Sequence, residues 1–192
     1  MKHLKMLGLA AVAAVALTAL TAGSASATTL EIGGVAQNQK VTLSQSLKPG
    51  SSITISRTDG SLANTCTAST THYETTTWGL AKVGWGTPSI TYSNCTRPIS
   101  VLKSGSGSIE HIASTTDGTV ESSGAEITVG SPFGTLNCQT GAGVDVGRLT
   151  GTASSHAELH VNAVLNCGFL VPSARLQGSY VTTSPTGLGV VP

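Results

Sequence analysis

The chain has 192 residues, of which ten are lysine or arginine and nine are aspartate or glutamate, so its formal net charge is +1. This balance gives no electrostatic reason to expect nucleic acid or an anionic membrane surface as a partner. Charged residues make up only 10% of the chain, and the mean hydropathy is +0.18, which argues against a highly charged disordered protein.

Residues 1–27 have the three parts of a secretory signal peptide. Lys2 and Lys5 form a basic start, residues 6–20 are an almost unbroken apolar run, and Ala-Ser-Ala at 25–27 supplies the small residues that signal peptidase requires. The apolar run is shorter than the roughly 20 residues of a membrane-spanning helix. We predict cleavage after residue 27, a secreted or cell-envelope location, and no membrane span after cleavage. A retained N-terminal anchor is the alternative.

Removal of this segment changes the composition of the chain. The net charge becomes −1, and the remaining 165 residues contain 26 threonines, 22 serines and 21 glycines. Residues 28–192 are enough for one domain. The core of that domain must come from a small supply of large apolar side chains, so we expect additional stabilisation from outside the core.

Four cysteines, Cys66, Cys95, Cys138 and Cys167, lie in the predicted exported part, where disulfides persist. Four cysteines allow three connectivities. Cys66 and Cys95 are 29 residues apart, as are Cys138 and Cys167, and the two pairs are offset by 72 residues. We predict two sequential disulfides, each stabilising by about 3.5 kcal/mol on the chain-entropy model. Structural zinc requires closely spaced cysteines, which are absent, so we expect no metal.

Alternation of apolar and polar residues predicts β-strands throughout the exported part. The pattern occurs at residues 53–55, 99–101, 125–129, 159–163 and 175–181. Short strands separated by turn residues favour an all-β antiparallel sandwich, Ig-like or jelly-roll-like, with ten to twelve strands; a β-barrel is the alternative. From about residue 184 we expect a loose tail or a short final edge strand.

Histidine and glutamate gather in one of these strands. His156, Glu158 and His160 would lie on the same face, with neighbours about 6.6 Å apart along the strand and the two histidines about 13 Å apart. A solvated strand face is the simpler interpretation. A secreted hydrolase or a metal-dependent enzyme that uses these three residues is the alternative. Because the common catalytic motifs are absent, we predict no catalysis and no cofactor.

Four of the seven aromatic residues lie between the first two cysteines: Tyr73, Trp78, Trp85 and Tyr92. Flat rings in a weakly charged, threonine-rich setting can stack on sugars or anchor a protein partner. The four residues are therefore a candidate ligand patch for a cell-wall glycan or a surface protein. Packing of the rings in the core is the alternative.

Three segments resemble a group of short exported bacterial proteins that are rich in β-structure. They are residues 122–138 (SSGAEITVGSPFGTLNC), 162–173 (NAVLNCGFLVPS) and 184–190 (SPTGLGV). The similarity extends over most of the chain after residue 27 and is densest after Glu110. No activity is assigned to that group, so the resemblance implies an exported bacterial protein and identifies no functional residue.

These observations predict a secreted or cell-envelope protein with a structural or binding role, without catalysis, and stabilised by two disulfides. The alternatives are the hydrolase or metal-dependent enzyme described above and an oligomeric β-barrel in the envelope, for which the expected strands are short and rich in threonine and serine.

Overall fold

A computed structural model describes residues 27–192 except 58, 60–63, 133, 153 and 170, so residues 1–26 of the predicted signal peptide lie outside it. The described part of the chain contains strands and no helix, as the alternating pattern predicts. The strands in chain order are β1 (Thr29–Ile32), β2 (Val35–Ala36), β3 (Thr42–Leu47), β4 (Ile53–Arg57), β5 (Asn64–Glu74), β6 (Val83–Trp85), β7 (Ser89–Cys95), β8 (Ile99–Lys103), β9 (Ser106–His111), β10 (Gly118–Ser123), β11 (Glu126–Ser131), β12 (Gly134–Gln139), β13 (Val144–Thr150), β14 (Glu158–Leu165), β15 (Ala174–Ser184) and β16 (Leu188–Val191).

Ten of these strands form one large antiparallel sheet, with β7 at one end and β6 at the other. β3 and β4 share one position in it, since each pairs with β5 on one side and β15 on the other. After β3 the chain makes a turn around Pro49 and Gly50, where Gly50 has a φ of 78°. It then re-enters the sheet as β4, in the same position between β5 and β15. From this shared position the sheet continues through β15, β14, β13, β10 and β9.

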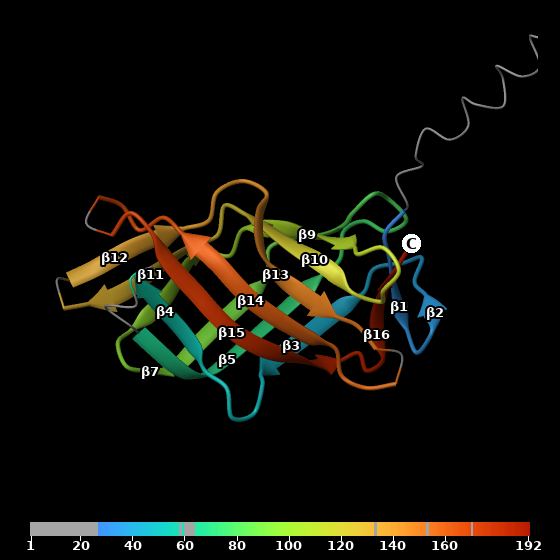
Figure 1. Ribbon diagram of the computed structural model, residues 1–192, viewed down its shortest axis with the longest axis horizontal. Coiled ribbons are helices and arrows are strands. Elements are labelled where there is room, and N and C mark those ends of the chain that lie inside the picture. Colours follow the sequence, from blue (N-terminus) through green and yellow to red (C-terminus); the bar gives the residue numbers. More distant parts are fainter. Residues whose placement is uncertain (1–26, 58, 60–63, 133, 153, 170) are drawn as a thin grey trace, which may run out of the picture.

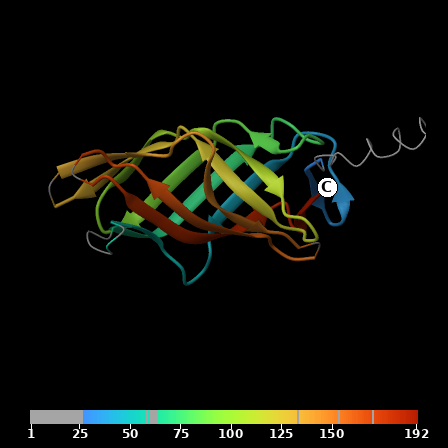
Figure 2. The same cartoon turned by 45° about the horizontal axis from the view of Figure 1, so that its top comes forward.

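The large sheet curls so that its two halves face each other. β13 and β14 lie in front of β5 and β7 (Figures 1 and 2), and the sheet turns at β15, which pairs with β3 and β4. The end strand β6 returns to the end of β5 through a bridge between Thr75 and Trp85. The result is an arrangement of packed antiparallel sheets that is sandwich-like and is not a closed barrel, as predicted for the fold class.

Two three-stranded sheets lie at the two ends of the molecule. β8, β11 and β12 form one, and β16, β1 and β2 form the other (Figure 1). The second sheet decides between the two expectations for the end of the chain: this end is a short edge strand and not a loose tail. Residues 188–191 pair with β1 along their whole length, and Leu188 and Val190 are fully buried. Burial of these two apolar side chains is the physical reason why the end of the chain is ordered.

The core consists of three clusters. One includes Leu30, Ile109 and Leu188 near β1 and β16, another includes Ile127 and Ala163 near β11, and a third consists of Ile53, Cys66 and Tyr180. Strands predicted from alternation supply inward side chains to the second cluster; for example, Ile127 and its neighbour two residues on are both buried. Inward-facing residues that are only partly buried pack against these clusters.

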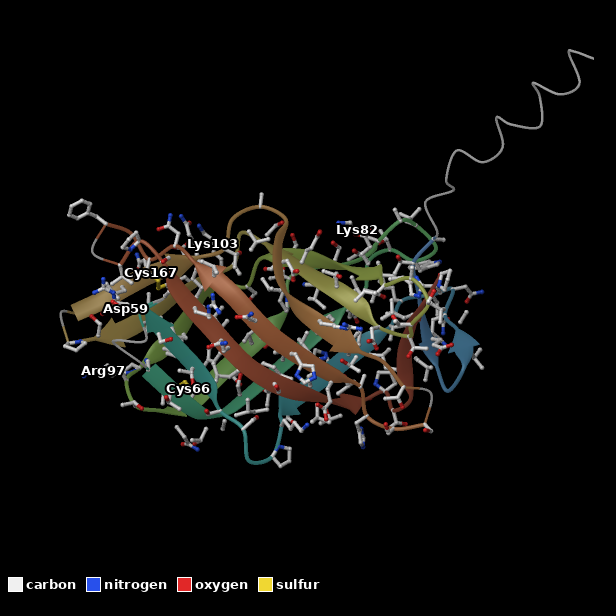
Figure 3. The ribbon with its side chains drawn as sticks, viewed as in Figure 1. Asp59, Cys66, Lys82, Arg97, Lys103 and Cys167 are labelled. Atoms are coloured by element: carbon white, nitrogen blue, oxygen red, sulfur yellow. A yellow bond between two sulfur atoms is a disulfide. The ribbon has the colours of Figure 1, made fainter. Side chains whose placement is uncertain are left out.

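Both predicted disulfides are present, which confirms the sequential pairing. Cys66 and Cys95 lie directly opposite each other on β5 and β7. Cys138 of β12 is bonded to Cys167 just after β14, beside the bridge that pairs Gln139 with Asn166, and so links the small sheet to the large one. Figure 3 shows Cys66 and Cys167 in the half of the molecule that holds β11 and β12. The first disulfide thus lies within the large sheet, whereas the second joins two sheets.

Replacement of both cysteines of one pair by alanine is expected to lower the free energy of unfolding by about 3.5 kcal/mol for either pair, because each bond closes a loop of similar length. Denaturant unfolding of Cys66→Ala/Cys95→Ala and Cys138→Ala/Cys167→Ala variants measures this effect. Non-reducing peptide mapping is the control for connectivity. Recovery of a peptide that joins Cys66 to Cys167 would contradict the structure.

Candidate functional site

An apolar cavity of about 140 Å³, partly open to solvent, lies among residues of all three core clusters. Its lining includes Tyr73 and Val120 from the first cluster and Ile127 and Ala163 from the second. The side chains in the middle of the sandwich are inward-facing and apolar, but they remain partly exposed because the cavity leaves one side of them uncovered; they are Tyr92, Val101, Val146, Leu159, Val161 and Leu176. The cavity is thus a gap in the core with an apolar wall.

Two aromatic rings form part of this wall. The rings of Tyr73 and Trp85 have their centroids 5.5 Å apart and are tilted by 46°. Trp85 of β6 pairs with Gly107 of β9, and a side chain at 107 would collide with the indole. Glycine at this position therefore lets the indole lie flat on the neighbouring strand, as aromatic residues do on strand glycines. This packing fixes the orientation of Trp85 at the cavity.

The three tyrosines of the chain all line the cavity, and burial raises the pKa of each hydroxyl. For Tyr180 the value rises to about 12. The Tyr180 hydroxyl lies 2.8 Å from Ser69 Oγ, and Ser69 donates its own hydrogen to the carbonyl of Thr91, so Tyr180 is the donor to Ser69. The hydroxyls of Tyr73 and Tyr92 form no hydrogen bond with any other residue that the structure describes.

Other polar groups of the lining are already paired. The Gln45 side chain, which is 2% exposed, donates to Thr182 Oγ1 at 3.3 Å and accepts from Thr71 Oγ1 at 3.2 Å. Lys103 is the one charged residue among the described residues of the lining, and its ammonium lies 2.9 Å from a Glu126 carboxylate oxygen. Figure 3 shows Lys103 at the edge of the molecule. The lining therefore offers no unpaired charge to a ligand.

The four aromatic residues of the candidate ligand patch do not lie together on the surface. Tyr73, Trp85 and Tyr92 line the cavity, whereas Trp78 lies in the loop between β5 and β6, is 39% exposed, and borders a separate small hollow with Gln37. The reason for the division is local: three of the rings stand on the inner face of strands, and Trp78 does not belong to a strand. Of these four rings, only Trp78 is available on the outside as a stacking surface for a sugar; Phe169, which is not one of the four, is 98% exposed.

A second hollow lies on the small sheet. It is a wider groove of about 420 Å³, lined by Arg97, Pro98, Ser100, Thr128, Gly130, Ser131, Gly134 and Thr135. Its lining has no aromatic ring among the described residues, and polar hydroxyls and glycine backbone form much of it. Ligand sites are generally apolar hollows with a few polar groups, and the cavity between the sheets matches that description better than this groove does.

His156, Glu158 and His160 each contact other residues, and the three do not converge on one site. His156 lies just before the strand, with Nδ1 2.7 Å from the carbonyl of Thr182. Glu158 forms an ion pair with Lys48 at 2.8 Å, and His160 Nε2 lies 3.6 Å from Glu158 Oε2. Across residues 27–192, with the omissions noted above, no group of three histidine, cysteine, aspartate or glutamate side chains is placed to hold a metal ion.

Ser179, which the sequence did not single out, completes a serine–histidine–glutamate line on this face. Its Oγ lies 3.1 Å from His160 Nδ1. However, the 3.6 Å separation between His160 and Glu158 is too long for a hydrogen bond, and Lys48 already holds the carboxylate. A similar serine–histidine contact joins Ser44 and His72 at 2.9 Å on β3 and β5. These pairs follow from histidines on the outer, serine-rich faces of strands.

Spectrophotometric titration is expected to show no tyrosine that ionises near the ordinary pKa of about 10 while the protein is folded. Between pH 10 and 12 the unfolded chain releases phenol protons that the folded chain retains, so the free energy of unfolding falls as the pH rises. Absorbance at 295 nm and circular dichroism should therefore change together above pH 10. A tyrosine that titrates near pH 10 with the fold intact would contradict this account of the cavity wall.

Comparisons with protein-family models, with curated proteins and with solved structures find no match to this chain. In the described part of the chain, no helix is long and apolar enough to cross a membrane. The conclusion about function therefore depends on the cavity, the disulfides and the sequence features.

Proposed function

We propose that the protein is an exported, non-catalytic binding domain that holds a small apolar molecule in the cavity between its sheets. The observation that carries this proposal is the apolar cavity between the sheets, with Tyr73, Trp85 and Tyr92 in its wall. The proposal replaces a surface patch of four aromatic rings with an internal site. A glycan or a surface protein as partner stays a prediction, for which Trp78 is the exposed ring.

The energetic cost of the cavity supports a role for it. An enclosed, unfilled apolar space of this size costs roughly 3 kcal/mol, at ~24 cal/mol for each Å³ of cavity, and this is the upper limit for a space that is partly open to solvent. That cost is a large fraction of the 5–15 kcal/mol that typically separates the folded from the unfolded state. A ligand that fills the space would recover contacts for the partly exposed lining residues Val146, Leu159 and Val161. An apolar occupant is thus energetically favourable.

Export is supported by features at the start of the chain. The basic and apolar residues before Ala27 have the pattern of a signal peptide. Among the described residues, the first strand pairing is at Thr28, next to the predicted cleavage site: Thr28 bridges to Leu80, and its side chain donates to the carbonyl of Ala81 at 2.7 Å. Two disulfides, with no free cysteine among the described residues, fit an oxidising compartment.

A binding role without catalysis is supported by the chemistry of the cavity wall. The described lining residues carry mainly hydroxyl, amide and apolar groups. No histidine and no carboxylate is among them. General acid–base catalysis needs a group that exchanges a proton near the working pH, and the phenols of Tyr73 and Tyr92 have pKa values raised by burial. These groups are suited to hold a molecule rather than to transform it.

Toluene is expected to bind in the cavity and to change the emission of Trp85. In a Trp78→Phe background Trp85 is the sole tryptophan, so its fluorescence reports on the cavity alone. A Val161→Phe substitution places extra volume in the cavity and should weaken toluene binding at least tenfold, with the thermal unfolding temperature unchanged or raised.

The matched control for this substitution is Val164→Phe, on the outer face of the same strand, where the native side chain is 48% exposed. It should leave toluene binding unchanged. Equal toluene affinity in the two phenylalanine variants, or no saturable change in Trp85 emission with the Trp78→Phe protein, would contradict a binding site between the sheets.

The exported form is expected to begin at Thr28. N-terminal sequencing of the protein from the medium or the envelope fraction should give Thr-Thr-Leu-Glu. An Ala25→Asp substitution should block cleavage, because signal peptidase requires small residues at the cleavage site, whereas a Gly23→Ala control should not. A wild-type chain that keeps residues 1–27 in the mature protein would refute the predicted cleavage.

A further inference from the structure

We infer that the cavity selects an uncharged, single-ring-sized molecule with one hydrogen-bonding oxygen, which the free hydroxyls of Tyr73 and Tyr92 bind. This inference rests on the proposed function and adds the chemistry of the ligand to it. Three observations carry it: the unpaired hydroxyls, the paired charge of the lining, and the size of the space.

The unpaired hydroxyls provide the polar contact. Tyr73 is 9% exposed, and neither its hydroxyl nor that of Tyr92 bonds to another residue within the described part of the chain. Tyr180, in the same lining, differs from them because its hydroxyl is hydrogen-bonded to Ser69. Both tyrosines line the cavity, so an oxygen acceptor bound there would gain a hydrogen bond that an apolar ligand of the same size does not make. A ketone, ester or ether oxygen accepts such a bond from tyrosine.

The charge of the lining excludes an ionised ligand. Lys103 is the one charged residue among the described lining residues, and its ammonium is already paired with Glu126 at 2.9 Å. The Lys103 side chain is 71% exposed, so its charge is also screened by water. A carboxylate or ammonium group that entered the cavity would lose its hydration without gaining an unpaired partner of opposite charge.

The volume of the cavity limits the ligand to about one ring. An engineered apolar cavity of about 150 Å³ binds benzene, and the cavity here is about 140 Å³. Trp85 and Tyr73, tilted against each other, provide an aromatic wall against which a ring can pack in an edge-to-face or offset geometry. A benzene ring with a small oxygen-containing substituent meets all three conditions.

Three probes of similar size separate these conditions: acetophenone is uncharged with a carbonyl oxygen, ethylbenzene has no oxygen, and benzoate is charged. Isothermal titration calorimetry with the purified protein should show acetophenone binding about five- to tenfold more tightly than ethylbenzene, the effect of one hydrogen bond. Benzoate should show no detectable binding at neutral pH.

Phenylalanine substitutions assign the preference to particular hydroxyls. Tyr73→Phe/Tyr92→Phe should abolish the preference for acetophenone over ethylbenzene, while ethylbenzene keeps its affinity. Tyr180→Phe is the matched control: it removes a hydroxyl from the same lining that is already bonded to Ser69, so the preference should remain. The thermal unfolding temperature of each variant shows that it is folded.

The outcomes distinguish this inference from the proposed function. If ethylbenzene and acetophenone bind equally well, or if the double variant keeps the preference, the hydrogen-bonding inference is wrong and the apolar site stands. If benzoate binds as tightly as acetophenone, the requirement for an uncharged ligand is wrong. If none of the three probes binds, both the inference and the binding function fail.

Discussion

Two stacked β-sheets leave a space about 10 Å thick that only inward-facing side chains can fill. This protein must fill it with few large residues, because the whole chain has seven aromatics and the part after residue 27 is dominated by threonine, serine and glycine. The large apolar side chains gather in three clusters, around Leu30 and Leu188, around Ile127, and around Ile53 and Tyr180. The middle of the sandwich is left with a cavity. The location of the candidate site thus follows from how a limited core is distributed.

The disulfides offset the stability that the cavity costs the fold. A cavity of this size costs at most roughly 3 kcal/mol, and each disulfide stabilises by about 3.5 kcal/mol, so a single bond offsets the gap. Cys138 is itself part of the cavity lining, and its bond to Cys167 links the small sheet that covers one end to the strand β14 that supplies Val161 and Ala163. A stable fold and an open interior are therefore compatible in an oxidising compartment.

Much of the fold was predictable because it depends on short-range patterns. Alternation identified the inward residues Ile53 and Ile127, and equal spacing identified the disulfide partners. The sequence did not show whether the end of the chain is a strand or a loose tail. The alternation that buries Leu188 and Val190 spans only four residues and lies among glycines. The cavity was not predictable for a different reason. It depends on the distance across the sandwich between residues such as Tyr92 and Val161, which no local pattern encodes.

The central claim is that the interior of the sandwich contains an accessible apolar space. Diffraction from crystals held under xenon pressure tests it most directly, since xenon enters empty apolar cavities without needing a specific ligand. The account predicts one well-occupied xenon site in contact with Tyr92, Val146 and Val161, within the lining defined here. Crystals in which side chains close the gap and xenon finds no site between the sheets would contradict it.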